Sequence, residues 1–185
     1  LVAGLPFYFM VQSGFKKQFD LLSHPFWMLP QEWVLENYRT VLEGTFLRSL
    51  LNSLIVVTIS VTLILLIASM AAFVFARMDF RLNRPLFGAG VAGLAIPAHV
   101  TLIPVYVLTT RLGLYDTLWA LIGPYVAFNL PLAIFILTEF MRQIPRELEE
   151  AARLDGAGPA SFFWRVALPL SRPGLATVGI YNAVA

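Results

Sequence analysis

The residues whose types and spacing suggest a specific task lie in one polar stretch, 142–172, between long apolar runs. Pro145 suits a first helical turn, and the glutamates that follow it lie where the helix dipole favours negative charge. Glu149 and Arg153 have the spacing of an i,i+4 ion pair, and Gly156 fits the left-handed position just after a helix end. The pattern therefore predicts a short helix that stops at Gly156.

A second short helix is predicted to begin at Pro159 and to end at Pro169. Its apolar residues form one stripe: Phe162, Phe163, Val166 and Ala167. Exposed aromatic side chains on a polar loop usually mark a surface that binds another protein. The alternative is an amphipathic hairpin on the membrane surface, but such helices carry Lys and Arg on their polar face, whereas this stretch is rich in Asp and Glu. Docking to a partner protein is the favoured interpretation.

The elements that must hold this stretch are membrane spans. Hydrophobic residues make up 58% of the chain and charged residues only 13%, whereas a soluble domain has about 25% charged residues. Three runs, 49–76, 85–110 and 117–138, exceed the roughly 20 residues that cross a bilayer core, and in lipid such runs must be helical. Small residues in the first run predict close helix packing: Ala68, Ser69, Ala71, Ala72 and Ala76.

Both ends of the chain are apolar but shorter than a span, over 1–11 and 174–185. We expect both to be truncated transmembrane helices. The first run could instead be the apolar part of a signal peptide, but no basic residue precedes it. Loop arginines set the orientation: loops 77–84 and 142–172 hold three and five Arg and are predicted to be cytoplasmic, which places 111–116 and 12–48 outside.

Two proline-containing segments are predicted to interrupt the spans. His99 lies between Pro97 and Pro104, which should bend that helix, and Asn129 precedes Pro131, which predicts a second break. Either polar side chain could line a solute path. For His99 a position near the membrane surface or against a neighbouring helix is the favoured alternative, and for Asn129 a simple packing kink is equally compatible with the sequence.

Several classes of function are disfavoured by composition. The chain has no cysteine, which excludes thiolate catalysis and thiolate metal sites, and a net charge of +2 does not suggest a nucleic-acid partner. No Gly-rich phosphate loop is present, so the chain is not expected to bind ATP, to need a cofactor or metal, or to be an enzyme. The spans are almost free of ionisable residues, which argues against an ion-coupled secondary transporter.

The 142–172 stretch resembles the signature of permease subunits of binding-protein-dependent ATP-binding cassette (ABC) importers. That signature is Glu-Ala-Ala, three residues, Gly, nine residues, then an aliphatic residue, any residue and Leu-Pro. It is filled here by 150–152, Gly156 and 166–169, with Val166 in place of the more usual isoleucine. Segments 36–38, 72–77, 103–106, 112–114 and 144–148 are similar to the carbohydrate-importer branch, and the nearest likeness is to smaller maltose-type permease subunits.

The resemblance implies an all-α fold, a polytopic transmembrane helix bundle of the type I ABC importer permease kind, truncated here at both ends. It implies a single permease domain over 1–185, multi-pass in the cell inner membrane, that transports sugars or related solutes. Its implied partners are cytoplasmic ATPase subunits, a second permease subunit, an external solute-binding protein and the lipid bilayer. The loop 142–172 would couple ATP hydrolysis to transport.

Residue roles follow from the same resemblance. Glu150 would be the polar contact to the ATPase, small residues would permit close approach, and the two phenylalanines would pack inside the element. The implied coupling residues are Glu150, Ala151, Ala152, Asp155, Gly156, Phe162, Phe163, Leu168 and Pro169. A membrane scaffold without a transport role is the remaining alternative, and it would leave this spacing to chance.

Overall fold

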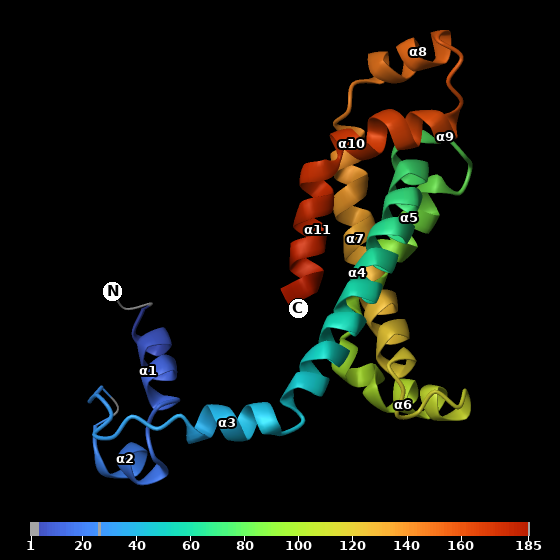
Figure 1. The fold of residues 1–185 in the computed structure, drawn as a ribbon. Helices are drawn as coiled ribbons and strands as arrows, with labels where there is room; N and C mark the ends of the chain where they lie inside the picture. Colours follow the sequence, from blue (N-terminus) through green and yellow to red (C-terminus); the bar gives the residue numbers. More distant parts are fainter. Residues whose placement is uncertain (1–3, 26, 185) are drawn as a thin grey trace. The chain divides into compact units, whose positions relative to one another are not determined.

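The computed structural model describes residues 4–25 and 27–184, and within them the regular elements are helices (Figure 1). The chain forms two compact units, Leu1–Ser53 and Leu54–Ala185, and each is described by itself. The prediction of one permease domain over 1–185 stays a prediction.

In the first unit, three short helices are joined by loops: α1 (Leu5–Ser13), α2 (Gln18–Ser23) and α3 (Glu36–Glu43). The side-chain amide of Asn37 donates hydrogen bonds to the carbonyl oxygens of Gly14 (3.1 Å) and Lys16 (2.9 Å). The ring of Phe15 packs between Trp33 and Tyr38, with ring centroids 5.3 and 5.0 Å apart. These contacts join the start of α3 to the loop after α1.

The remaining helices are α4 (Phe46–Arg77), α5 (Asn83–Ala92), α6 (Leu102–Arg111), α7 (Trp119–Arg142), α8 (Arg146–Leu154), α9 (Pro159–Phe162), α10 (Leu168–Leu170) and α11 (Arg172–Val184). Two 3₁₀ turns, Gly93–Ala95 and Ala98–Thr101, lie between α5 and α6, and a π-helical turn, Phe163–Ala167, joins α9 to α10. In Figure 1, α11 lies beside α7, and α8 lies beyond the ends of the long helices.

Within residues 4–25 and 27–184, two helices are long and apolar enough to cross a membrane, α4 with 32 residues and α7 with 24. They confirm the spans predicted from the first and third apolar runs. The second run forms two helical segments, Asn83–Ala95 and His99–Arg111, that meet at an angle of 84°. The predicted bend is therefore confirmed. Its cause is local, because Ile96 precedes a proline and takes the extended backbone (φ −82°, ψ 113°) that a proline imposes on the residue before it.

The core of the second unit lies where α4, α7, α9 and α11 meet. Small residues predicted to allow close packing are buried there, with Ala68 and Ala72 at 0% exposure. The buried apolar side chains of this core are Ile64, Ala68, Ala72, Phe73, Ala133, Leu137, Met141, Ile144, Phe162, Phe163, Ala167 and Val178. This core joins the predicted loop 142–172 to the ends of the spans.

Two predicted interruptions are wrong. α7 runs continuously through Asn129 and Pro131, because one proline removes a single backbone hydrogen bond, while unwinding a helix in lipid would leave several groups unpaired. Helical structure also continues through Pro169 to Leu170. Pro169 lies in the first turn of α10, directly after the π-helical turn, and a first helical turn tolerates proline because its N–H would be unpaired in any case.

Candidate functional site

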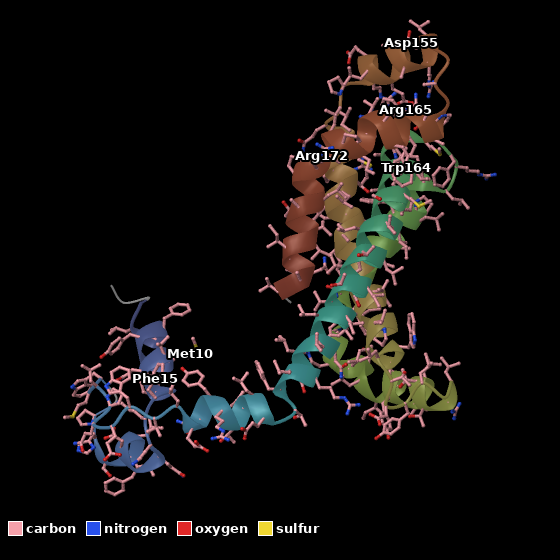
Figure 2. All side chains as sticks on the ribbon, viewed as in Figure 1. Met10, Phe15, Asp155, Trp164, Arg165 and Arg172 are labelled. Atoms are coloured by element: carbon pink, nitrogen blue, oxygen red, sulfur yellow. The ribbon has the colours of Figure 1, made fainter. Side chains whose placement is uncertain are left out.

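The segment predicted to couple to a partner is a helix–Gly–helix element. α8 ends at Leu154, and Gly156 follows with φ of +81°, a backbone conformation that favours glycine. The N–H of Ala157 donates to the carbonyl of Ala152 (2.8 Å), and the N–H of Gly156 donates to that of Arg153 (3.0 Å). These two bonds form a Schellman cap and confirm the helix end predicted at Gly156. Figure 2 shows Asp155 at this outer end of α8.

The second half of the element is held against the spans by its aromatic residues. Phe162 and Phe163 are 3% and 5% exposed, and their rings lie 6.2 and 5.2 Å from the ring of Phe73 in α4. Ala167 is fully buried in the same core. The prediction that these residues form an exposed stripe is wrong, because both rings pack against Phe73 of α4 and Ala167 belongs to the same core. Trp164 alone of the three aromatics is exposed, at 54%.

A buried arginine holds α8 at the end of the spans. The side chain of Arg77, the last residue of α4, is 4% exposed and lies 3.7 Å from the Glu149 carboxylate. Its guanidinium donates to the carbonyl oxygens of Met141 (2.7 Å) and Ile144, where α7 ends. Glu149 also accepts a hydrogen bond from Arg153 at 2.6 Å, which confirms the predicted i,i+4 pair. Arg77 thus joins three helices in one polar contact.

The outer face of α8 is left free by these contacts. Glu150 and Ala151 are exposed, whereas Ala152 is half-buried and packs against the core. Leu154 is 90% exposed, which is unusual for a leucine. The resulting surface has apolar side chains, Leu154 the most exposed of them, beside acidic groups, and it is suited to a partner that offers an apolar contact and a positive charge.

The turn between the helices is hollowed on one side. A shallow pocket of about 340 Å³ is lined by Ala152, Asp155, Gly156, Ala157, Gly158, Ser161, Phe162, Arg165 and Val166. It brings together four of the predicted coupling residues, Ala152, Asp155, Gly156 and Phe162. Leu168 and Pro169 are half-buried and lie outside this pocket. Leu168 packs against the core and so supports the element on its inner side.

The two polar residues predicted as candidates for a solute path lie at different positions. His99 is exposed in the second 3₁₀ turn, at the bend between α5 and α6. Asn129 is half-buried in α7, and its side chain donates to the carbonyl of Tyr125 at 2.9 Å. A Cβ atom at Gly93 would lie 3.6 Å from the Pro131 ring, so the bend packs against α7 close to Asn129. The roles of both residues stay predictions.

Sequence reasoning missed two residues of this site. In the sequence, Arg77 indicates the orientation of its loop and belongs to a segment that carries the family resemblance, but its contact with Glu149 is not predicted. An arginine that ends a 32-residue apolar helix is a natural partner for a glutamate in another loop on the same side of the membrane. Leu154 was missed because it lies next to the predicted helix end, where the apolar periodicity of α8 stops. The sequence feature that points to Leu154 is its position between two charged residues, Arg153 and Asp155.

The fold and this element define a class of protein: over the residues that the structure describes, it is a helical integral membrane protein with a helix–Gly–helix element at the end of its spans. Residues 41–185 match the family model described as "binding-protein-dependent transport system inner membrane component". The chain belongs to this family and is an inner-membrane protein.

Individual relatives agree with that assignment. The chain is 57% identical over 182 residues to a Caldicellulosiruptor sp. protein named ABC transporter permease protein ORF2, covering 98% of this chain and 66% of that protein. It is 38% identical over 183 residues to the diacetylchitobiose uptake system permease protein NgcG of Streptomyces coelicolor, covering 98% of this chain and 60% of that one. The chain thus spans less than two thirds of either relative.

A solved structure shows the same fold. The crystal structure of a bacterial ABC transporter involved in the import of the acidic polysaccharide alginate contains a chain that superposes with a TM-score of 0.86. The match covers 100% of this chain and 65% of that one, with 24% sequence identity. The predicted all-α transmembrane fold is confirmed by this match.

Proposed function

We propose that the full-length protein is a permease subunit of an ATP-driven, binding-protein-dependent importer of sugars or related solutes. It works with cytoplasmic ATPase subunits, a second permease subunit and an external solute-binding protein. The family membership of residues 41–185 supports the transport class. The sugar assignment rests on relatives named for diacetylchitobiose, trehalose and melibiose/raffinose/stachyose transport.

The observation that carries the coupling role is the two-sided build of the helix–Gly–helix element. Its inner side is fixed to α4 and α7 by Phe162, Phe163 and Arg77. Its outer side presents Glu150 and Leu154 without a packing partner in this chain's core. An element whose inner side is packed rigidly against the spans and whose outer side is free to bind a partner can transmit a displacement applied to it.

The proposed mechanism uses this rigidity. An ATPase seated against 150–156 moves when it closes on ATP, and α8 moves with it. The buried contacts pass that movement to the ends of α4 and α7, which turn as bodies and change the access of the pathway. ATP hydrolysis takes place in the separate subunit, and this chain performs no reaction of its own.

Two polar side chains are the candidates for lining the solute path. His99 and Asn129 are retained as candidates because the bend between α5 and α6 packs near Pro131 of α7. The irregular backbone of the bend and the side-chain amide of Asn129 therefore lie at a similar depth along the spans. Irregular backbone inside a membrane needs protein or a water-filled cavity around it. No direct contact with solute is assigned to either residue.

The test is native mass spectrometry of the full-length subunit, gently solubilised from its membrane. A complex with two ATPase copies and one further permease is expected. Glu150→Lys should then reduce ATPase occupancy at least tenfold, since disruption of an interfacial charge contact costs about 2–5 kcal/mol. Glu36→Lys, at an exposed helical glutamate of α3, is the matched charge-reversal control and should leave occupancy unchanged.

A subunit that transports with no ATPase bound would overturn the proposal and favour an ion-coupled transporter. Equal ATPase occupancy in the two variants would leave the transport class intact but would remove Glu150 from the interface.

A further inference from the structure

A pocket rich in arginine lies at the ends of α4, α5 and α7. It has a volume of about 740 Å³ and is lined by Phe75, Ala76, Arg77, Asp79, Phe80, Arg81, Asn83, Arg84, Pro85, Arg142 and Arg146. Five of these residues are arginines and one is an acid. The lining of the pocket does not include Glu150 or Leu154, although Arg77, Asp79 and Arg146 also line a smaller recess beside Glu149 and Glu150.

The charges of this pocket are only partly neutralised within the chain. Arg77 is paired with Glu149, and Arg142 is paired with Glu139 at 2.7 Å. Among the described residues, Arg81, Arg84 and Arg146 have no carboxylate within 4.0 Å. The remaining acid is Asp79, so the three free guanidinium groups leave an excess of positive charge in the pocket.

The pocket has a fixed shape and an apolar wall. The side-chain amide of Asn83 donates to the carbonyl oxygens of Met78 (2.7 Å) and Phe75 (3.3 Å), which holds the turn that carries Arg81. The rings of Phe75 and Phe80, which line the pocket, lie 6.4 Å apart. Phe87, which is not a lining residue, lies 5.5 Å from the Phe75 ring and 5.0 Å from the Arg142 guanidinium. Charged and aromatic groups therefore meet in one recess.

The position of the pocket along the spans indicates its ligand. Arg77 ends α4, Arg142 ends α7 and Arg84 lies in the first turn of α5. These residues mark the level at which apolar helices leave the hydrocarbon, which is the level of lipid headgroups. Guanidinium groups bind phosphate through paired hydrogen bonds, and an apolar wall beside them accepts the start of an acyl chain.

We propose that this arginine pocket binds the phosphate headgroup of an anionic phospholipid. The phosphodiester lies between Arg81, Arg84 and Arg146, and the glycerol backbone contacts Phe75 and Phe80. A soluble phosphate compound offers the same charge but no acyl chain, so it gains nothing from the apolar wall. An acidic surface of a partner protein is the other possible occupant, and the experiment separates it from lipid. This site does not depend on the proposed solute or on the coupling role of Glu150.

The experiment is native mass spectrometry of the full-length permease in detergent, titrated with phosphatidylglycerol, phosphatidylcholine or free glycerol phosphate. Phosphatidylglycerol is expected to bind in preference to phosphatidylcholine. The double variant Arg81→Gln, Arg84→Gln should weaken phosphatidylglycerol binding about 30-fold, since each basic residue near an anionic headgroup contributes about a fivefold factor. The matched control is Arg172→Gln, an exposed arginine in α11 outside the pocket, which should bind phosphatidylglycerol like the parent.

Each contrary outcome overturns the proposal. Equal phosphatidylglycerol binding by the double variant and the control would show that these arginines do not form the site. Displacement of lipid by glycerol phosphate alone would assign the pocket to a soluble anion. Loss of a bound protein subunit from the double variant, with lipid binding unchanged, would assign it to a protein interface.

Discussion

Replacing Arg77 with methionine tests whether one buried arginine holds α8 against the ends of α4 and α7. Methionine is long and apolar, so it keeps much of the packing but removes every hydrogen-bond donor. The carbonyl oxygens of Met141 and Ile144 then lose the guanidinium donor, and the Glu149 carboxylate, 16% exposed, loses one of its two positive neighbours. The expected result is frequent local unfolding of α8 with intact membrane spans.

The size of the effect follows from these contacts. A hydrogen bond that involves a charged group contributes about 1.5–3 kcal/mol, so two of them contribute about 3–6 kcal/mol. These two bonds hold the chain directly before α8, and the largely buried pair of Arg77 and Glu149, 3.7 Å apart, is the direct contact with α8. The loss of that pair is not added to the sum, because Glu149 keeps its shorter bond to Arg153. Some of the loss is recovered when water reaches the freed carbonyls. About 3 kcal/mol is therefore the working value, which is about a hundredfold increase in the open population of α8.

Limited trypsin digestion of the full-length protein measures that population. Arg153 is 66% exposed but lies inside α8, so cleavage after it requires local unfolding. The Arg77→Met variant should be cut at Arg153 about a hundredfold faster than the parent, and Arg77→Lys, which keeps the charge with fewer donors, should be intermediate. Arg172→Met, at an exposed site, is the control. A change of less than twofold in the Arg77→Met variant would refute the anchoring role.

Two further predictions use pairs of glycines that differ in one property. A Cβ at Gly174 would lie 2.7 Å from Phe140, so Gly174→Ala should destabilise the packing of α11 by about 1–3 kcal/mol and lower the melting temperature in detergent. Gly179→Ala is the control and should not lower it, because a Cβ there would lie 3.7 Å from its nearest neighbour atom. Equal melting temperatures of the two variants would contradict this packing. Gly156 and Gly158 both have open space around them, but φ is +81° at Gly156 and −75° at Gly158. Gly156→Ala should therefore loosen the cap by about 1–2 kcal/mol and raise cleavage at Arg153 about tenfold, while an equal effect of Gly158→Ala would show that backbone strain is not the cause.

Local signals in the sequence predicted the parts of this element that depend on single residues. Gly156 is the cap because only its left-handed backbone completes the two bonds that end α8. Pro159 begins α9 because its missing N–H has no role in a first helical turn. The pair of Glu149 and Arg153 forms because residues four apart meet on one face of any helix.

The features that the sequence did not predict depend on neighbours far along the chain. The family resemblance implied that Phe162 and Phe163 pack inside the element, but their contact with Phe73 in α4 depends on an apolar surface that no local pattern reveals. Continuity of α7 through Pro131 is set by the membrane, where unwinding costs more than one lost hydrogen bond. Arg77 is a further case, because its partners come from the end of α7 and from α8.

The two anchors of the helix–Gly–helix element differ in kind, and this difference bears on how it could transmit a force. The aromatic anchor at Phe73 resists separation in every direction, since apolar burial is non-directional. The Arg77 anchor is directional, because its bonds to Met141 and Ile144 require alignment and fix the end of α7, and the chain that leads into α8, against the end of α4. With the aromatic anchor alone α8 could pivot under load, and with both it must move together with α4 and α7. If α8 has the proposed coupling role, loss of Arg77 should therefore uncouple ATP hydrolysis from transport, while ATPase binding, assigned in the proposal to the outer face of α8, is retained whenever α8 is folded.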